Sequence, residues 1–112
     1  MVFDFNKLKR ETFDMIMPGD ADVSLHLLRP IKSQINTISS AVNAIDEMVA
    51  NQKVTNEQLD LLTSVTAEML SRNLENKHYT KDEILNKFDV DEMIYFIDNY
   101  LSFVLSFTTE KN

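Results

Sequence analysis

Two histidines, His26 and His78, are the side chains of this chain that would most readily serve as catalytic bases or metal ligands. A catalytic triad also needs a motif that places a nucleophile beside the base, such as the Gly-x-Ser-x-Gly turn, and the chain has none. The His-Glu-x-x-His spacing that binds zinc on a helix is also absent. The histidines therefore predict neither a catalytic triad nor a metal site.

The carboxylates offer no better candidate site. Asp89 and Asp91 have the spacing that begins a calcium-binding loop, but that loop needs Gly at its sixth position and Glu at its twelfth. This chain has Ile94 and Tyr100 at those two positions. Other carboxylates are neighbours in the sequence and point apart on a helix, so they cannot readily act together as acid and base. These pairs are Asp46-Glu47, Asp82-Glu83 and Asp91-Glu92.

Composition excludes further classes of site. The chain has no cysteine, which rules out thiolate nucleophiles, disulfides and cysteine-bound zinc or iron–sulfur clusters. Its single glycine cannot build a glycine-rich phosphate loop. We therefore predict that the protein is not an enzyme and uses no cofactor or metal ion.

The charge balance indicates which partners to expect. The formal net charge is −7, and the only basic cluster is Lys7, Lys9 and Arg10. Proteins that bind nucleic acid usually present a basic face, so we expect no nucleic-acid partner. A membrane partner is not expected either, because no stretch of about 18 uninterrupted apolar residues exists. The segment before residue 12 lacks the apolar run of a signal peptide, and we expect a cytoplasmic protein.

An N-terminal β-hairpin is predicted by alternation with a period of two. Apolar and polar residues alternate over 12–17 and again over 23–29, and the Pro-Gly-Asp-Ala-Asp segment 18–22 between them is typical of a turn. Pro30 ends the second strand because it lacks the N–H that a sheet requires. A hairpin is only marginally stable alone in water, so its apolar face must lie against the helices or another chain.

The rest of the chain predicts helices. A narrow apolar seam over 31–49 marks the first helix, expected at about 33–51, and a wider apolar arc marks a central second helix that fades at about 75. Three capping-box pairs mark helix starts: Thr55 with Gln58, Thr80 with Glu83, and Asp89 with Glu92. We predict an α+β fold that is mostly helical, with the hairpin followed by three to four helices. The single domain 1–112 would comprise an N-terminal segment and hairpin at 1–31, a helical part at 32–107 and a flexible tail at 108–112.

The last helix carries two apolar edges. Over 93–107 the apolar residues sweep roughly 200° of the helical wheel, about twice the stripe of an ordinary surface helix. One interpretation packs one edge on the second helix and the other on the hairpin; the alternative leaves the aromatic edge open for a partner or for self-association. Aromatic residues and methionine are enriched in interface cores. The candidate partner-binding residues are Met93, Phe96, Tyr100, Phe103 and Phe107.

The order of the segments resembles a known family. The chain has Phe-Asp-Phe-Asn-Lys-Leu-Lys-Arg at 3–10, Arg-Pro-Ile-Lys after the hairpin at 29–32, and then only helices. Later it has Tyr-Thr-Lys-Asp-Glu-Ile at 79–84 and Phe-Asp-Val-Asp-Glu-Met at 88–93, before the aromatic helix. In this order it resembles the small tail assembly chaperones of long-tailed phages of Gram-positive hosts.

The resemblance implies a function. Such a chaperone would bind and solubilise the helical, apolar tape-measure protein during tail morphogenesis, through apolar helix and hairpin surfaces. It would act in the cytoplasm of the host bacterium and be absent from the mature virion. Two alternatives stay open: an acidic phage inhibitor of a host nucleic-acid-binding defence protein, or a structural subunit of the tail or connector. The inhibitor would present its carboxylates as one stripe, whereas the structural subunit would form stable rings.

Overall fold

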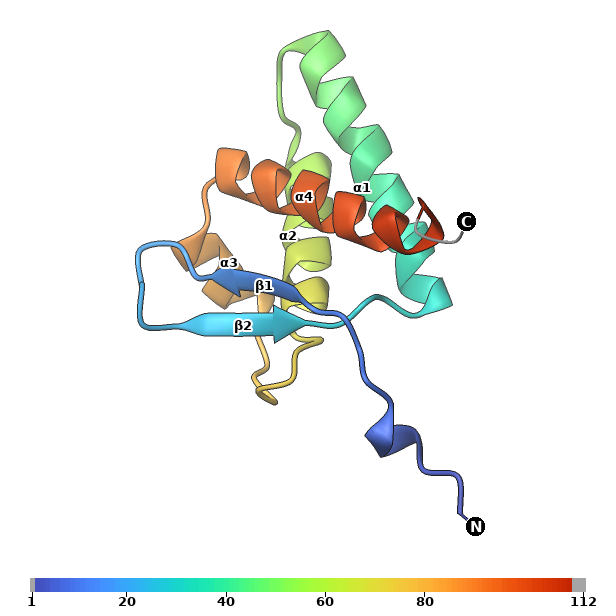
Figure 1. Cartoon of the computed structure of the whole chain (residues 1–112). Helices are drawn as coiled ribbons and strands as arrows, with labels where there is room; N and C mark the ends of the chain where they lie inside the picture. Colours follow the sequence, from blue (N-terminus) through green and yellow to red (C-terminus); the bar gives the residue numbers. More distant parts are fainter. Residues whose placement is uncertain (1, 110–112) are drawn as a thin grey trace.

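The computed structural model describes residues 2–109, apart from the side chains of residue 6 and residues 107–109. Within this range the chain forms a two-stranded antiparallel hairpin followed by four helices, which confirms the predicted α+β fold (Figure 1). The elements are the 3-10 helix η1 (Phe5–Lys7), β1 (Phe13–Ile16), β2 (Ser24–Leu27), α1 (Lys32–Asn51), α2 (Asn56–Leu70), α3 (Lys81–Lys87) and α4 (Val90–Thr109). The predicted tail 108–112 falls mainly outside the described residues, and α4 continues to Thr109.

The hairpin has the predicted place and the predicted turn. Phe13 pairs with Leu27 and Met15 pairs with Leu25, so the four side chains share the inner face of the sheet. Gly19 has a φ of 70° in the turn, a left-handed conformation that glycine adopts without steric cost. The alternation seen in the sequence therefore sets which face of the hairpin is buried.

The three capping boxes form as predicted. The Thr55 hydroxyl accepts from the Gln58 N–H at 3.1 Å, and Gln58 Oε1 accepts from the Thr55 N–H at 2.9 Å. Thr80 with Glu83 and Asp89 with Glu92 make the same reciprocal bonds at the starts of α3 and α4. Local side-chain chemistry thus fixes where these three helices begin.

One hydrophobic core connects the hairpin with all four helices. Helix α2 is central, as predicted: it contacts α1, α3, α4 and β2, and Leu62, Val65 and Met69 are fully buried. The seam predicted on α1 is only partly right. Ile38 and Ile45 are buried, but Ile35 and Val49 are exposed. The remaining buried residues of α1 are Ala41, Ala44 and Met48, because α1 meets α2 and α4 along a face rotated from the seam.

Candidate functional site

The structure places most of the predicted partner-binding residues in the core. Met93, Phe96 and Tyr100 are buried, and Phe103 is half-buried. The side chain of Phe107 lies outside the described residues. Of the two interpretations left open by the sequence, the burial of these three residues favours the one in which the last helix packs both of its apolar edges within the fold.

Strand β1 covers this aromatic edge. The Phe13 ring lies 6.1 Å from the ring of Phe96, 5.7 Å from Tyr100 and 5.8 Å from Phe103, between ring centroids. The Tyr100 hydroxyl donates a hydrogen bond to the Leu28 carbonyl, and burial raises the pKa of this hydroxyl. The hairpin thus uses one aromatic side chain to seal an edge that, in the sequence, has the features of an interface.

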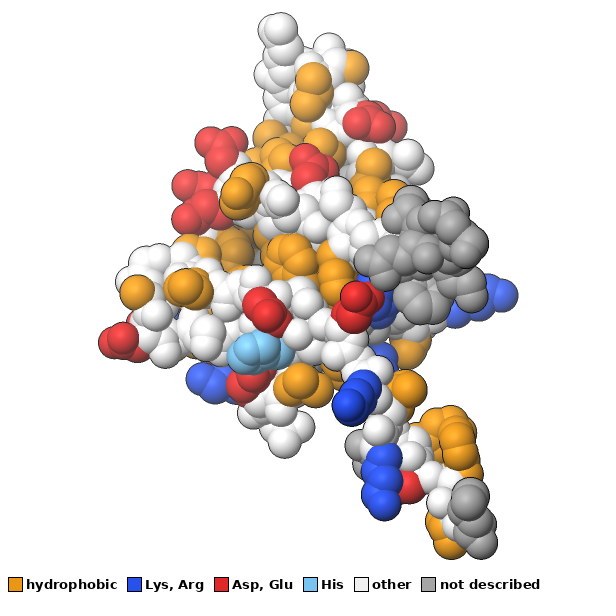
Figure 2. All heavy atoms as spheres, viewed as in Figure 1, with side chains coloured by type: hydrophobic (Ala, Val, Ile, Leu, Met, Phe, Trp, Pro, Cys, Tyr) orange, Lys and Arg blue, Asp and Glu red, His pale blue; other side chains and the backbone are white. Residues whose placement is uncertain are grey.

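An apolar groove remains beside the covered edge, between β1 and α4. It has a volume of about 400 Å³, and its wall includes Phe13, Met15 and Ile16 of β1 and Tyr95 and Phe96 of α4. The Ile16 and Tyr95 side chains are 63% and 74% exposed. On the face shown in Figure 2, hydrophobic side chains gather between α4 and the hairpin.

The groove borders an open strand edge. Met17 donates its N–H to the Val23 carbonyl at 2.9 Å, and in an antiparallel pair such bonded residues alternate. The register then directs the N–H and C=O groups of Asp14 and Ile16 away from β2. The contacts found within residues 2–109 include no backbone hydrogen bond for these outward groups. Such an edge can pair with another extended segment.

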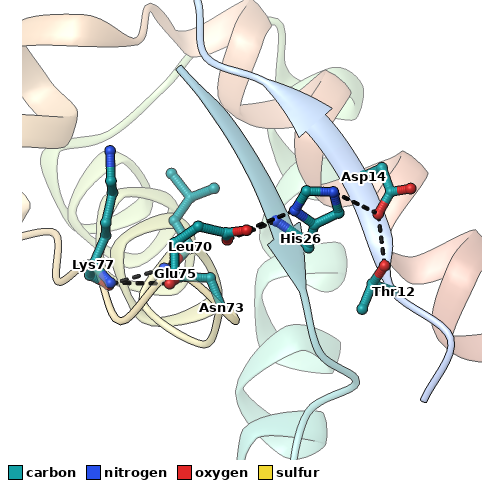
Figure 3. A network of polar contacts seen from close by, with 7 residues as sticks. All are labelled: Thr12, Asp14, His26, Leu70, Asn73, Glu75 and Lys77. Carbon is teal, nitrogen blue, oxygen red and sulfur yellow. Dashed lines mark hydrogen bonds and ion pairs between the residues drawn. The ribbon is translucent and has the colours of Figure 1, made fainter. Parts of the chain in front are cut away.

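The other edge of the hairpin is covered by the loop after α2 (Figure 3). His26 Nδ1 lies 2.6 Å from Glu75 Oε2, and the His26 N–H donates to Glu75 Oε1 at 3.0 Å. The hydrogen bond to Glu75 raises the pKa of His26, and the bond from the His26 backbone lowers the pKa of Glu75. Asp14 of β1 reaches His26 Nε2 at 4.0 Å.

This polar cluster has a structural explanation. The Glu75 carboxylate ties the loop to β2, the Asp14 carboxylate approaches His26 from β1, and no nucleophile approaches His26 among the contacts of Figure 3. In the sequence, Glu75 and Asn73 had no feature beyond the fading of the second helix. Only their contacts with β2 across the fold reveal their role.

The remaining hollows and polar clusters of residues 2–109 offer no chemical site. One hollow of about 600 Å³ is an open depression between α1, α2 and the loop before α3, and it includes exposed His78. No group of three histidine or carboxylate side chains in the described part of the chain could hold a metal ion. Nor is any helix in that part long and apolar enough to cross a membrane.

The groove and the open edge of β1 are therefore the features of this structure best suited to binding. Comparisons of the chain with models of known families, with curated proteins and with solved structures find no match.

Proposed function

We propose that this protein is a tail assembly chaperone that binds and solubilises a tape-measure protein in the cytoplasm of the host bacterium. One observation carries the proposal: an apolar groove lies directly beside an unpaired strand edge. This combination suits a partner that offers backbone hydrogen bonds and apolar side chains together. The resemblance of the segment order to phage tail assembly chaperones supplies the identity of the partner.

Strand addition is the mode of binding that the groove supports. An extended client segment would pair with the outward N–H and C=O groups of Asp14 and Ile16. Alternate side chains of that segment would then enter the groove toward Phe96 and contact Tyr95. The client-binding surface is thus the wall of the groove, which includes Phe96 of the otherwise covered aromatic edge.

The acidic net charge supports the proposed solubilisation of the tape-measure protein. A net charge of −7 on each bound copy would make an apolar client repel its neighbours and stay in solution. The client would be released when tail-tube subunits replace the chaperone, so the protein would be absent from the mature virion.

Co-expression with the tape-measure protein encoded beside the gene for this chain is the direct test. We expect the parent chain to keep the tape-measure protein in the soluble fraction. Ile16→Asp and Tyr95→Asp should abolish this effect, because each places a charge on the wall of the groove without touching the core. Val49→Asp, at an exposed position near the end of α1, is the matched control and should act like the parent.

Circular dichroism of each variant would verify that the domain stays folded. Equal solubility of the tape-measure protein with the parent chain, with Ile16→Asp and without any chaperone would overturn the proposal. A neighbouring gene set that encodes no tape-measure protein would overturn it as well.

A further inference from the structure

The segment before the hairpin has no role in the proposed function. We call residues 2–10 the arm. Four large apolar side chains of the arm are between 60% and 88% exposed: Val2, Phe3, Phe5 and Leu8. The arm extends away from the rest of the molecule in Figure 1. So much apolar side chain on one exposed segment is typical of an interaction site.

The arm differs from the rest of the chain in charge. It carries three basic residues and one acidic residue, a net charge of +2, whereas the remainder carries −9. The charged residues of the groove beside β1 have the opposite sign to the net charge of the arm. Its wall includes Asp14 and Glu92 and no basic residue. Arm and groove are therefore complementary in charge, and both are apolar.

The spacing of the arm's aromatic residues suits strand addition. Phe3 and Phe5 are two positions apart, so in an extended conformation both rings point to the same side. In the structure the two ring centroids lie 4.7 Å apart with Phe5 at the start of the 3-10 helix η1, so η1 would unwind when the arm pairs as a strand. A strand that places two neighbouring rings on one side can direct both into the groove while its backbone pairs with β1.

The arm of a chain is poorly placed to reach its own groove. It leads directly into β1, and Glu11 forms an ion pair with Arg29 at 3.2 Å beyond the end of β2. The chain before Glu11 then continues away from the hairpin in Figure 1. To fold back along β1 it would have to reverse within residues 8–12, a stretch without glycine or proline.

We infer that the arm of one copy binds in the groove of a second copy as a strand added to β1. Phe3 and Phe5 enter the groove, and the basic residues of the arm lie near Asp14 and Glu92. Because arm and groove are different surfaces, two copies can exchange arms in a closed dimer, or successive copies can join head-to-tail. The regulatory role of this contact rests on the proposed function, because the arm would close the groove until a client segment displaces it.

Disulfide trapping between two single-cysteine variants tests the pairing, since the chain has no cysteine of its own. Val2→Cys lies in the arm, and Asn99→Cys lies at the groove. Mixing the two and oxidising them should give a cross-linked heterodimer. Val2→Cys mixed with Val49→Cys, at a distant exposed position, should give little of this product. Equal yields from both mixtures would overturn the inference.

Sedimentation velocity tests the association itself. The parent chain should form species heavier than a monomer as its concentration rises, and added salt should weaken them because opposite charges contribute. Deletion of residues 2–8 should leave a monomer; the large apolar side chains that it removes are exposed, and it keeps residues 9–11, which lie beside Leu28 and Arg29. The inference would be overturned if the parent chain sedimented as a monomer at every concentration. This holds also for a monomer whose arm occupies its own groove.

The two proposals fail in different ways. If the parent is monomeric but still solubilises the tape-measure protein, only the arm contact is wrong. If the arm contact forms but Ile16→Asp still solubilises the tape-measure protein, the client does not use the groove and the proposed site of client binding is wrong. The chain lacking residues 2–8 should solubilise the client at least as well as the parent, because its groove is never closed.

Discussion

The two edges of the hairpin differ: the edge of β2 is covered by another segment of the chain, and the edge of β1 is open. Along β2, the Leu28 N–H donates to the Arg72 carbonyl at 2.9 Å, and the Leu74 N–H donates to the His26 carbonyl at 3.0 Å. The His26 N–H is held by the Glu75 carboxylate. The outward groups of His26 and Leu28 that make these bonds are thus satisfied by the loop that follows α2. Along β1, the corresponding groups of Asp14 and Ile16 face the groove.

The difference follows from chain connectivity. Helix α2 ends at Leu70, and the next residues run back along β2 because Asn73 holds the loop in a tight turn. No comparable segment of the described chain follows β1 on its outer side. Proteins usually block exposed strand edges because these edges promote aggregation. An edge left open beside an apolar groove, while its counterpart is covered, supports a binding role for β1.

The largest expected effect comes from prolines at neighbouring positions of β1. Met15→Pro should lower the free energy of unfolding by about 2–4 kcal/mol, because it removes an N–H that bonds β2 and a side chain that packs on the core. Ile16→Pro should cost about 1 kcal/mol or less, because proline is tolerated where the N–H points outward from an edge strand. Urea unfolding of both variants measures the difference.

The same pair separates stability from binding. Ile16→Pro keeps the fold but removes a donor at the open edge, so it should solubilise the tape-measure protein poorly and associate weakly with itself. Equal destabilisation by the two prolines would mean that the Ile16 N–H has a partner within the fold, and that the edge of β1 is not open.

Asn73→Ala should have the next largest effect, by loosening the covered edge. The buried amide of Asn73 donates to the carbonyls of Leu70 and Lys77 at 2.7 and 2.8 Å and accepts from the Lys77 N–H at 3.0 Å. Losing these bonds should lower the free energy of unfolding by about 2–3 kcal/mol. Hydrogen exchange of the Leu28 and Leu74 amides should also become faster.

Asn86→Ala is the matched control, because Asn86 is exposed on α3. It should change the stability by no more than about 0.5 kcal/mol. If Asn73→Ala and Asn86→Ala behaved alike, the turn would not be what covers β2.

The sequence predicts the structural features that depend on contacts between residues close together along the chain. Alternation places the hairpin, and the Thr55, Thr80 and Asp89 boxes place the starts of three helices, because the partner of each side chain lies two or three residues away. The end of α2 was predicted too late, at about residue 75. The polar groups of Ser71 and Asn73 that stop it bond to Tyr79 and Lys77, farther along the chain.

Contacts between distant segments were not predictable in the same way. The aromatic edge of α4 has the composition of an interface, and only its contact with Phe13 shows that the hairpin covers it. Ile35 and Val49 fit the periodic seam of α1 but are exposed, because the direction from which α2 approaches is not encoded in the spacing. The groove likewise exists only between β1 and α4, which lie more than 70 residues apart.

The smallest expected effect is a pH dependence of the stability that the contact between His26 and Glu75 gives to the covered edge. The pKa of His26 is raised above 6.5 in the folded chain, so protonation stabilises the fold below the unfolded pKa and this contribution is lost as the pH rises through the folded value. The pKa of Glu75 is lowered from 4.5, so its contribution is present above that value and is lost as the pH falls through the folded one. The pair therefore stabilises the loop most between pH 4.5 and 6.5, and its contribution is lost as the pH moves out through the lowered pKa of Glu75 or the raised pKa of His26. Both side chains are partly exposed, so solvent screens their attraction.

The His26→Gln variant tests this window, with His78→Gln as the control for the second histidine. The difference in urea midpoint between the parent and His26→Gln should be larger near about pH 5.5 than near about pH 8.5, on either side of the ordinary histidine value. His78→Gln should leave the contact between β2 and the loop intact, because His78 lies outside that contact. An NMR titration of the His26 ring gives the same test without unfolding: its pKa should fall toward 6.5 in Glu75→Gln. An unchanged titration in that variant would mean that Glu75 does not hold the loop against β2 through His26. The backbone bonds of Leu28 and Leu74 would then have to cover this edge alone.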